Sequence, residues 1–197
     1  PELSTDEMPI LDPVANSAGI FNVPVRDEDT PTTNDAPVVA PSPYWGDERI
    51  WDSKSNIHNP MLDQAGRVWL TARIRGPNNP DFCKEGSEHP SAMLYPKERT
   101  SRQLSVLDPA TGEYSFVDTC FSTHHLQFAY DDSNTLWTSG GGDVVGWLDT
   151  NKFMATGDAE ASQGWAPLIL DTNGNGRQDA WTEPGEDSDP SLDTRIP

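Results

Sequence analysis

The 197-residue sequence carries its densest set of oxygen side chains in a short stretch around residue 175. Asp171, Asn173, Asn175 and Asp179 stand at positions one, three, five and nine of a loop, and Gly176 stands at position six. Alternating oxygens at this spacing wrap around one calcium ion, the glycine allows a sharp reversal, and position seven contributes its backbone carbonyl. The spacing therefore predicts Ca2+ bound by Asp171, Asn173, Asn175, the Arg177 carbonyl and Asp179.

The predicted calcium loop resembles those of EF-hands, dockerins and thrombospondin type 3 repeats, and it departs from the EF-hand pattern at position twelve. EF-hands carry a bidentate glutamate there, whereas this chain has Thr182, with Glu183 one residue later. We expect Glu183 to complete the shell. Residues 168–170 and 180–181 read as strands, so the loop is expected in a β-hairpin over residues 166–184. The alternative is an asparagine-glycine turn that binds no ion.

Three histidines offer a second kind of chemistry. His124 and His125 open one apolar strand, and His58 precedes the corresponding strand of an earlier, similar segment. Around a central channel, these imidazoles would bind a second divalent metal or act as a general base. Neighbours on a strand point to opposite faces, so only one of His124 and His125 is expected to face the channel. The alternative is that each histidine bonds a loop carbonyl. His89 is expected in a surface loop.

Cys83 and Cys120 are the two cysteines of the chain. An acidic chain with two cysteines and no further close metal ligands favours a disulfide and an oxidising compartment, periplasmic or extracellular. The alternative is a pair of free thiols. A bond between Cys83 and Cys120 would tie an inserted segment to the rest of the fold.

The elements that must position these side chains are short strands. Residues 104–153 contain apolar runs that alternate with polar residues and are separated by turn sequences such as Asp108–Gly112 and 131–134, without a helical period. This rhythm predicts a four-stranded antiparallel meander of the size of one β-propeller blade. The expected fold class is therefore all-β, a β-propeller present as a partial set of blades.

A repeat relates this stretch to an earlier one. Asp63 precedes Trp69 by six residues, as Asp131 precedes Trp137, and Leu107 and Leu148 are 41 residues apart. The two tryptophans are 68 residues apart, and the excess over 41 matches an insertion at residues 76–102. We therefore expect the partial propeller over residues 44–197, with Trp69 and Trp137 at equivalent positions of neighbouring blades.

The repeat resembles that of the virginiamycin B (streptogramin) lyase family of β-propellers. The likeness rests on the closing strand from Leu107 to Gly112, on the strand start at His125–Gln127 and on the repeat tryptophans. It covers about residues 56–73 and 103–153. The resemblance implies a propeller scaffold and makes the inner histidines, His58, His124 and His125, the catalytic candidates.

The chain departs from that family where a glutamate commonly follows the tryptophan-threonine pair and helps to hold a metal. Ala72 and Ser139 take those places. The residues present therefore favour a secreted or periplasmic, calcium-stabilised propeller that binds a ligand or partner. The alternative is a metal-assisted lyase or hydrolase of the streptogramin-lyase type, with a histidine-lined channel site.

Blade number and composition indicate the partners. Propellers have typically four to eight blades, and the repeats account for two and part of a third, so the expected partner is further propeller sequence in the same or another chain. A start at Pro1 without methionine fits a processed or truncated protein. The net charge of -19 argues against nucleic acid and anionic membranes. No apolar run approaches the ~20 residues of a membrane span.

Residues 1–43 form an acidic, proline-rich block, with eight of the eighteen prolines. Residues 38–43 favour an extended, polyproline-like backbone. The block is either a disordered leader or an extended arm that lies across a folded surface, pinned by Ile20, Phe21 and Val23.

Overall fold

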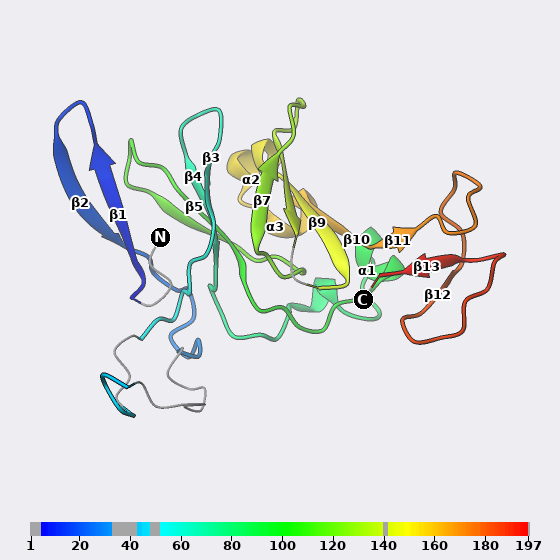
Figure 1. Cartoon of the computed structure of the whole chain (residues 1–197). Helices are drawn as coiled ribbons and strands as arrows, with labels where there is room; N and C mark the ends of the chain where they lie inside the picture. Colours follow the sequence, from blue (N-terminus) through cyan, green and yellow to red (C-terminus); the bar gives the residue numbers. More distant parts are fainter. Residues whose placement is uncertain (1–4, 33–42, 48–51, 140–141, 197) are drawn as a thin grey trace.

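The structure, a computed structural model, describes residues 5–32, 43–47, 52–139 and 142–196 (Figure 1). Apart from Pro43, the segment expected to adopt a polyproline-like backbone lies outside these ranges. The strands are β1 (Glu7–Asp12), β2 (Ser17–Asn22), β3 (Pro60–Leu62), β4 (Val68–Ala72), β5 (Gln103–Leu107), β6 (Tyr114–Val117), β7 (His125–Phe128), β8 (Thr135–Ser139), β9 (Val144–Asp149), β10 (Gln163–Pro167), β11 (Ile169–Leu170), β12 (Trp181–Thr182) and β13 (Asp193–Arg195). The helical segments are η2 (Asp81–Cys83), α1 (Pro90–Leu94), α2 (Thr150–Thr156) and α3 (Ala159–Ser162).

Two four-stranded antiparallel sheets form the centre of the molecule. The first has the order β3-β4-β5-β6 and the second the order β7-β8-β9-β10, so each is a simple meander. Trp69 lies in the second strand of the first sheet and Trp137 in the second strand of the second sheet, as the repeat predicts. The described residues form a mostly β structure, and they do not close into a ring of sheets.

The prediction that residues 104–153 form one meander is wrong, because that stretch spans two sheets. It contains β5 and β6, the third and fourth strands of the first sheet, and β7, β8 and β9 of the second. The fourth strand of the second sheet is β10, which follows two short helices. Asp149 caps α2 by accepting a hydrogen bond from Lys152 N, and Gly157 ends it with a left-handed backbone. Residues 150–153, expected near the end of the meander, are therefore helical.

The two sheets share one hydrophobic core. Trp69, Leu104, Val106 and Val117 on one face of the first sheet pack with a set from the second sheet and its helix, namely Leu126, Leu136, Leu148 and Phe153. The indole N–H of Trp69 donates to the carboxylate of Asp63 at 2.9 Å, so the polar atom of this buried ring has a partner. The first strands of the two sheets, β3 and β7, approach each other at one edge of this core.

The other face of the first sheet is covered by the N-terminal hairpin of β1 and β2. Met8 and Val23 are buried there against Leu70 and Leu107, and the ring of Phe21 stacks on that of Tyr114 at 5.5 Å. Of the two alternatives for this segment, these contacts agree with the arm rather than with the disordered leader. Ile20, the third expected anchor, is exposed instead. The segment is thus an ordered hairpin over residues 7–22.

The insertion between β4 and β5 is tied to the second sheet. Cys83 and Cys120 form a disulfide, which confirms the predicted pair. Both cysteines are buried beside Phe121, Val144 and Trp165. The covalent bond and this small core hold the inserted segment in place.

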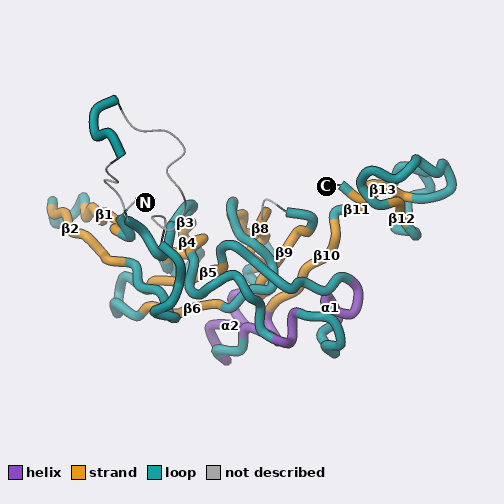
Figure 2. The backbone as a smooth tube through the Cα atoms, turned by 90° about the horizontal axis from the view of Figure 1, so that it is seen from below, coloured by secondary structure: helices purple, strands orange, loops and turns teal. Residues whose placement is uncertain are grey.

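A separate three-stranded unit lies at the far end of the second sheet, opposite the hairpin (Figures 1 and 2). The predicted β-hairpin over residues 166–184 is wrong in its pairing. β13 lies between β11 and β12, pairing antiparallel with the first and parallel with the second. The two strands that flank the loop, β11 and β12, therefore form backbone hydrogen bonds with residues 193–195 and not with each other.

No helix in the described ranges is long and apolar enough to cross a membrane.

Candidate metal centre

The starts of β3 and β7, the first strands of the two sheets, position three histidines. His58 stands two residues before β3, and its backbone N–H donates to the Thr71 carbonyl at 3.0 Å. Thr71 holds the next residue as well, because Asn59 N donates to its hydroxyl at 2.9 Å. His124 immediately precedes β7 and His125 is its first residue. Since β3 and β7 are neighbours, the three imidazoles meet at the shared edge of the two sheets.

The histidine cluster, defined as His58, His124 and His125, has ring nitrogens close enough together for one metal ion to bind all three. One ring nitrogen of each residue lies within 4.8 Å of those of the other two. The rings of His58 and His124 are stacked with centroids 4.0 Å apart, and the His125 ring stands edge-on to both. His58 and His124 are half-buried, whereas His125 is exposed. A metal bound here would be open to solvent on one side.

The expectation that only one of His124 and His125 faces the centre is wrong. The alternation rule holds for two residues within one pleated strand. His124 lies just outside β7, so its side chain is free of that constraint and turns to the same side as His125.

The cluster favours neutral imidazoles, the form that binds metal. Partial desolvation lowers the pKa of His58, and the neighbouring His124, Arg102 and His125 lower it further. Desolvation, His125 and Arg102 likewise lower the pKa of His124. No Asp, Glu or Cys of the described residues belongs to the cluster.

Arg102 was not singled out in the sequence, although it stands at the entrance to β5. Its Nε donates to the Asn56 carbonyl at 2.9 Å and its Nη2 to the Asn56 side-chain oxygen at 3.1 Å. Asn56 has a left-handed backbone, with φ of 44°, two residues before His58. Arg102 thus holds the turn at Asn56 that positions His58, and it adds a positive charge beside the cluster.

The predicted calcium loop lies in the unit of β11, β12 and β13. Asp171 accepts hydrogen bonds from Asn175 N at 3.1 Å and Gly176 N at 2.8 Å, which closes the loop on itself. The side-chain amides of Asn173 and Asn175 both donate to one oxygen of Asp179. The loop therefore gathers the oxygen-bearing side chains expected at positions one, three, five and nine around one turn, while the exposed Arg177 donates its N–H to Asn175.

Glu183, expected to complete the calcium shell, is directed elsewhere. Its carboxylate pairs with Arg195 at 2.6 Å and accepts the indole N–H of Trp181 at 2.9 Å. Arg195 also lies over the ring of Tyr95 in the insertion. Glu183 therefore connects β12 to β13 rather than to the loop.

A buried carboxylate that sequence reasoning missed stands beside the loop. Asp193, at the start of β13, is 0% exposed, and its Oδ2 accepts a hydrogen bond from the Asp179 N–H at 2.8 Å. One sequence signal was available, because Leu192-Asp193-Thr194 repeats the tripeptide Leu170-Asp171-Thr172. The two copies meet, with the hydroxyls of Thr172 and Thr194 3.0 Å apart.

His89, expected in a surface loop, is a structural anchor. Its Nδ1 accepts a hydrogen bond from Ser91 N at the start of α1, and its Nε2 lies 3.2 Å from the Gln163 carbonyl. Its ring stacks on Trp165 at 4.8 Å. His89 thus joins the insertion to β10 and is not a member of the histidine cluster.

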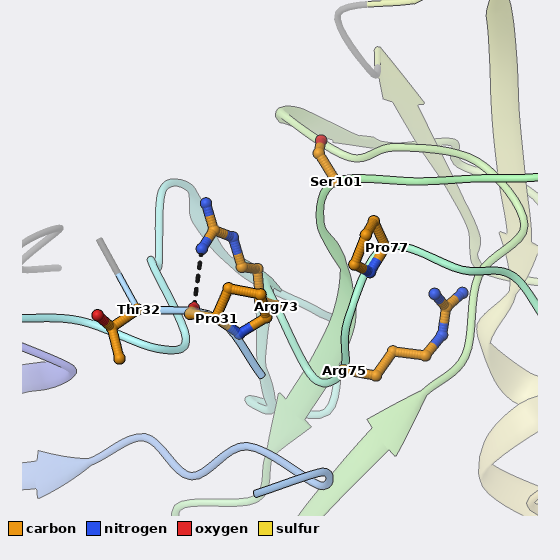
Figure 3. Close-up of a pocket in the computed structure, with 6 residues that line it drawn as sticks. All are labelled: Pro31, Thr32, Arg73, Arg75, Pro77 and Ser101. Atoms are coloured by element: carbon orange, nitrogen blue, oxygen red, sulfur yellow. Dashed lines mark hydrogen bonds between the residues drawn. The ribbon is translucent and has the colours of Figure 1, made fainter. Parts of the chain in front are cut away.

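A pocket between the ends of β4 and β5 is lined by Pro31, Thr32, Arg73, Arg75, Pro77 and Ser101 (Figure 3). The guanidinium group of Arg75 is buried and bonded to Asp118, Asn79 and three backbone carbonyls, so its role is structural. Arg73 donates to the Pro31 carbonyl at 3.1 Å, which links the N-terminal segment to β4.

Comparisons of this chain with protein-family models, with curated proteins and with solved structures find no match.

Proposed function

We propose that the two sheets are neighbouring blades of a β-propeller and that the histidine cluster binds a divalent transition metal at its inner edge. The observation that carries this proposal is the convergence of three ring nitrogens within 4.8 Å. Imidazole nitrogens suit zinc, copper, iron and nickel. Zinc binds histidine at about 2.0–2.1 Å, so small side-chain rotations bring the three nitrogens around one ion. We expect Zn2+ as the ion.

The propeller assignment is supported by the way the two sheets repeat. Each is a four-stranded meander, and one face of the first packs on the opposite face of the second. The corresponding outer face of the second sheet carries Trp137 and Trp147, with Trp137 41% exposed. The equivalent face of the first sheet is covered by the second sheet, so we expect a further blade of the same kind to cover this one. The resemblance to the virginiamycin B lyase repeat agrees with this architecture.

The function that follows is metal-dependent binding of a ligand. Three nitrogen ligands leave coordination positions open on the exposed side, beside His125. Arg102 adds a positive charge there, in a chain whose net charge is -19. We therefore expect the ligand of the metal to be an anion. The disulfide favours a periplasmic or extracellular setting, where such bonds persist.

A metal-assisted lyase or hydrolase is the second candidate, since an open three-histidine site is also a catalytic arrangement. It requires a group that moves a proton. The cluster contains no carboxylate within the described ranges, and Ala72 and Ser139 stand where the lyase repeat has glutamate. Ligand binding is therefore the function that these residues support better.

The test is a Zn2+ titration of the disulfide-bonded chain by calorimetry, with His58→Ala, His124→Ala and His125→Ala compared with wild type. We expect one ion per chain and at least tenfold weaker binding in each variant. His89→Ala is the matched control, because His89 lies outside the cluster, and it should bind zinc as wild type does. Absence of micromolar binding, or binding indifferent to all three substitutions, would refute the site.

The pH dependence gives an independent reading of the same site. Because the pKa of His58 and that of His124 lie below the ordinary value of 6.5, both rings stay neutral to lower pH than a free histidine. Zinc binding should therefore weaken as the pH falls below 6.5, where protons begin to compete with the metal for His58 and His124. NMR titration of the imidazole C–H signals in the metal-free chain should give midpoints below 6.5 for these two residues.

A further inference from the structure

We propose that Asp193 completes a calcium site with the loop of residues 171–179, in the position that sequence reasoning gave to Glu183. This site is separate from the histidine cluster and does not depend on the function proposed for it. The observation that carries it is a buried carboxylate oxygen without a partner. Oδ1 of Asp193 is buried and forms no hydrogen bond among the described residues.

The burial of Asp193 favours a cation beside its carboxylate. An ionised carboxylate removed from water is strongly unfavourable unless it is paired or coordinates a metal. Asp193 is fully buried, and the ion pairs of the described residues do not include it. Its one side-chain bond is that of Oδ2 with the Asp179 N–H. A single amide donor satisfies one oxygen and leaves the charge uncompensated.

The carboxylate of Asp193 is aimed at the loop. The Asp179 N–H that it accepts belongs to the ninth position of the predicted calcium loop. The loop also lies against the segment leading into β13, because Asn173 Nδ2 donates to the Ser191 carbonyl at 3.4 Å and Thr172 bonds Thr194. The Asp193 carboxylate therefore contacts the loop backbone, and its Oδ1, which has no hydrogen-bond partner among the described residues, is the oxygen left to bind an ion.

The chemistry of this set selects a hard cation. Asp171, Asp179 and Asp193 supply three carboxylates, and Asn173, Asn175 and the Arg177 carbonyl supply neutral oxygens. Calcium takes six to eight such oxygens in variable geometry, whereas magnesium requires a smaller, near-octahedral site. Three negative charges also exceed the two that the loop alone provides, so the affinity should be higher than that of the loop without Asp193.

The arrangement further indicates that the loop contracts around the ion. The three carboxylates do not yet lie within 4.8 Å of one another, and the amide nitrogens of Asn173 and Asn175 face the same oxygen of Asp179. Rotation of each amide would bring its oxygen, instead of its nitrogen, toward the Asp179 carboxylate. Two such oxygens repel each other unless a cation lies between them. Calcium should therefore order the loop and β13 together.

Terbium luminescence tests the site on the intact, disulfide-bonded chain. Trp181 is two residues from Asp179 and pairs with Asp193 across β12 and β13, so its excitation should sensitise Tb3+ bound in the loop. We expect emission that Ca2+ displaces and Mg2+ does not. Asp193→Asn should weaken calcium binding at least tenfold. Asp187→Asn, a change of an exposed carboxylate six residues away, should leave it within twofold.

Thermal melts separate a metal ligand from a merely structural residue. Calcium should raise the Tm of wild type, and Asp193→Asn should abolish the shift. In chelator, Asp193→Asn should melt at or above the wild-type Tm, because it removes a buried charge and keeps an oxygen for the Asp179 N–H. A structural role alone would lower the Tm in both conditions.

Two outcomes would overturn the proposal. One is calcium binding by Asp193→Asn as tight as that of wild type. The other is a wild-type chain whose Tm and Tb3+ emission do not respond to millimolar Ca2+. Were Asp193→Asn unable to fold, hydrogen exchange of wild type decides the matter, since calcium should slow the amides of Asp179 and β13. Unchanged exchange at both places would also overturn it.

Discussion

Trp69 and Trp137 occupy the same position in the two four-stranded sheets, yet Trp69 is 0% exposed and Trp137 is 41% exposed. Trp69 lies between the sheets and donates its N–H to Asp63, whereas Trp137 lies beside Trp147 on the outer face. The same residue in the same strand thus has a neighbouring sheet in one case and solvent in the other.

Truncation of these two tryptophans should have unequal effects on stability. Trp69→Ala removes a fully buried ring and leaves the Asp63 carboxylate without its indole partner, so we expect a loss of about 3–5 kcal/mol or failure to fold. Trp137→Ala should cost less than about 2 kcal/mol, since part of its surface is already in water. Urea denaturation of the two variants measures the difference, and equal losses would contradict the assignment of the outer face.

Two glycines at close approaches should also differ when changed to alanine. A Cβ at Gly146 would lie 2.2 Å from the ring of Phe121, which is fully buried and cannot move aside. A Cβ at Gly164 would lie 2.3 Å from the ring of Trp147, which is half-exposed and can turn outward. We expect Gly146→Ala to cost about 1–3 kcal/mol, in the range for overpacking, and Gly164→Ala to cost less.

Thermal denaturation of both alanine variants checks this order. Trp147 fluorescence should shift in Gly164→Ala if its ring turns toward solvent. A larger loss in Gly164→Ala than in Gly146→Ala would mean that the packing around β9 and β10 differs from that described.

The hairpin of β1 and β2 should detach when Asp6 is replaced. The Asp6 carboxylate accepts hydrogen bonds from the hydroxyls of Ser53 and Ser55, each at 2.5 Å, and from the Lys54 and Ser55 N–H groups. Asp6→Ala should therefore speed hydrogen exchange of the amides in residues 7–22 and leave those of β4 and β5 unchanged. Glu7→Gln, a change of the neighbouring acidic residue at the start of β1, is the control and should exchange as wild type does.

Low pH should loosen the hairpin of β1 and β2 as Asp6→Ala does. Burial acts to raise the pKa of Asp6, but the bonds from Ser53, Ser55 and Lys54 outweigh it and the pKa lies below the ordinary 3.8. The unfolded chain thus binds the proton more readily, so the contribution of Asp6 is complete above pH 3.8 and is lost as the pH falls below it. Exchange in the hairpin should rise in that window before the sheets unfold.

Removal of the disulfide should lower stability substantially. The bond joins cysteines 37 residues apart, for which the loss of chain entropy in the unfolded state corresponds to about 4 kcal/mol. Cys83→Ala with Cys120→Ala should therefore reduce the free energy of unfolding by that order. Guanidinium denaturation of the double variant, with wild type in oxidised and reduced form beside it, measures the effect. An unchanged midpoint would show that the buried packing alone holds the insertion.

Local patterns predicted those parts of the fold that local chemistry determines. The apolar alternation and the turns predicted β4 to β9, the Asp–Trp repeat predicted the equivalence of Trp69 and Trp137, and the histidines lie where the first strands of the two sheets begin. The disulfide followed because two cysteines have one possible partner each. In each case the signal lies within a few residues of the feature.

The missed features depend on residues far apart in the chain or on weak local signals. β10 reads Gln-Gly-Trp-Ala-Pro, and its glycine and proline have a low propensity for strands. It is a strand because it pairs with the edge of β9. α2 was missed although Asp149 and Gly157 are ordinary caps, since Asp-Thr-Asn also reads as a turn. Asp193 lies 14 residues beyond Asp179, and only the fold brings it to the loop.

The insertion has a consequence for the order in which the chain folds. In the first sheet, 30 residues separate β4 from β5, whereas only four separate β8 from β9 in the second. The entropy of closing a loop grows with the logarithm of its length, which places the pairing of β4 with β5 at a disadvantage of about 2 kcal/mol. Contacts between residues distant in sequence also form more slowly. The second sheet should therefore assemble first, and the first sheet, although nearer the N-terminus, should complete its pairing on the surface that the second provides.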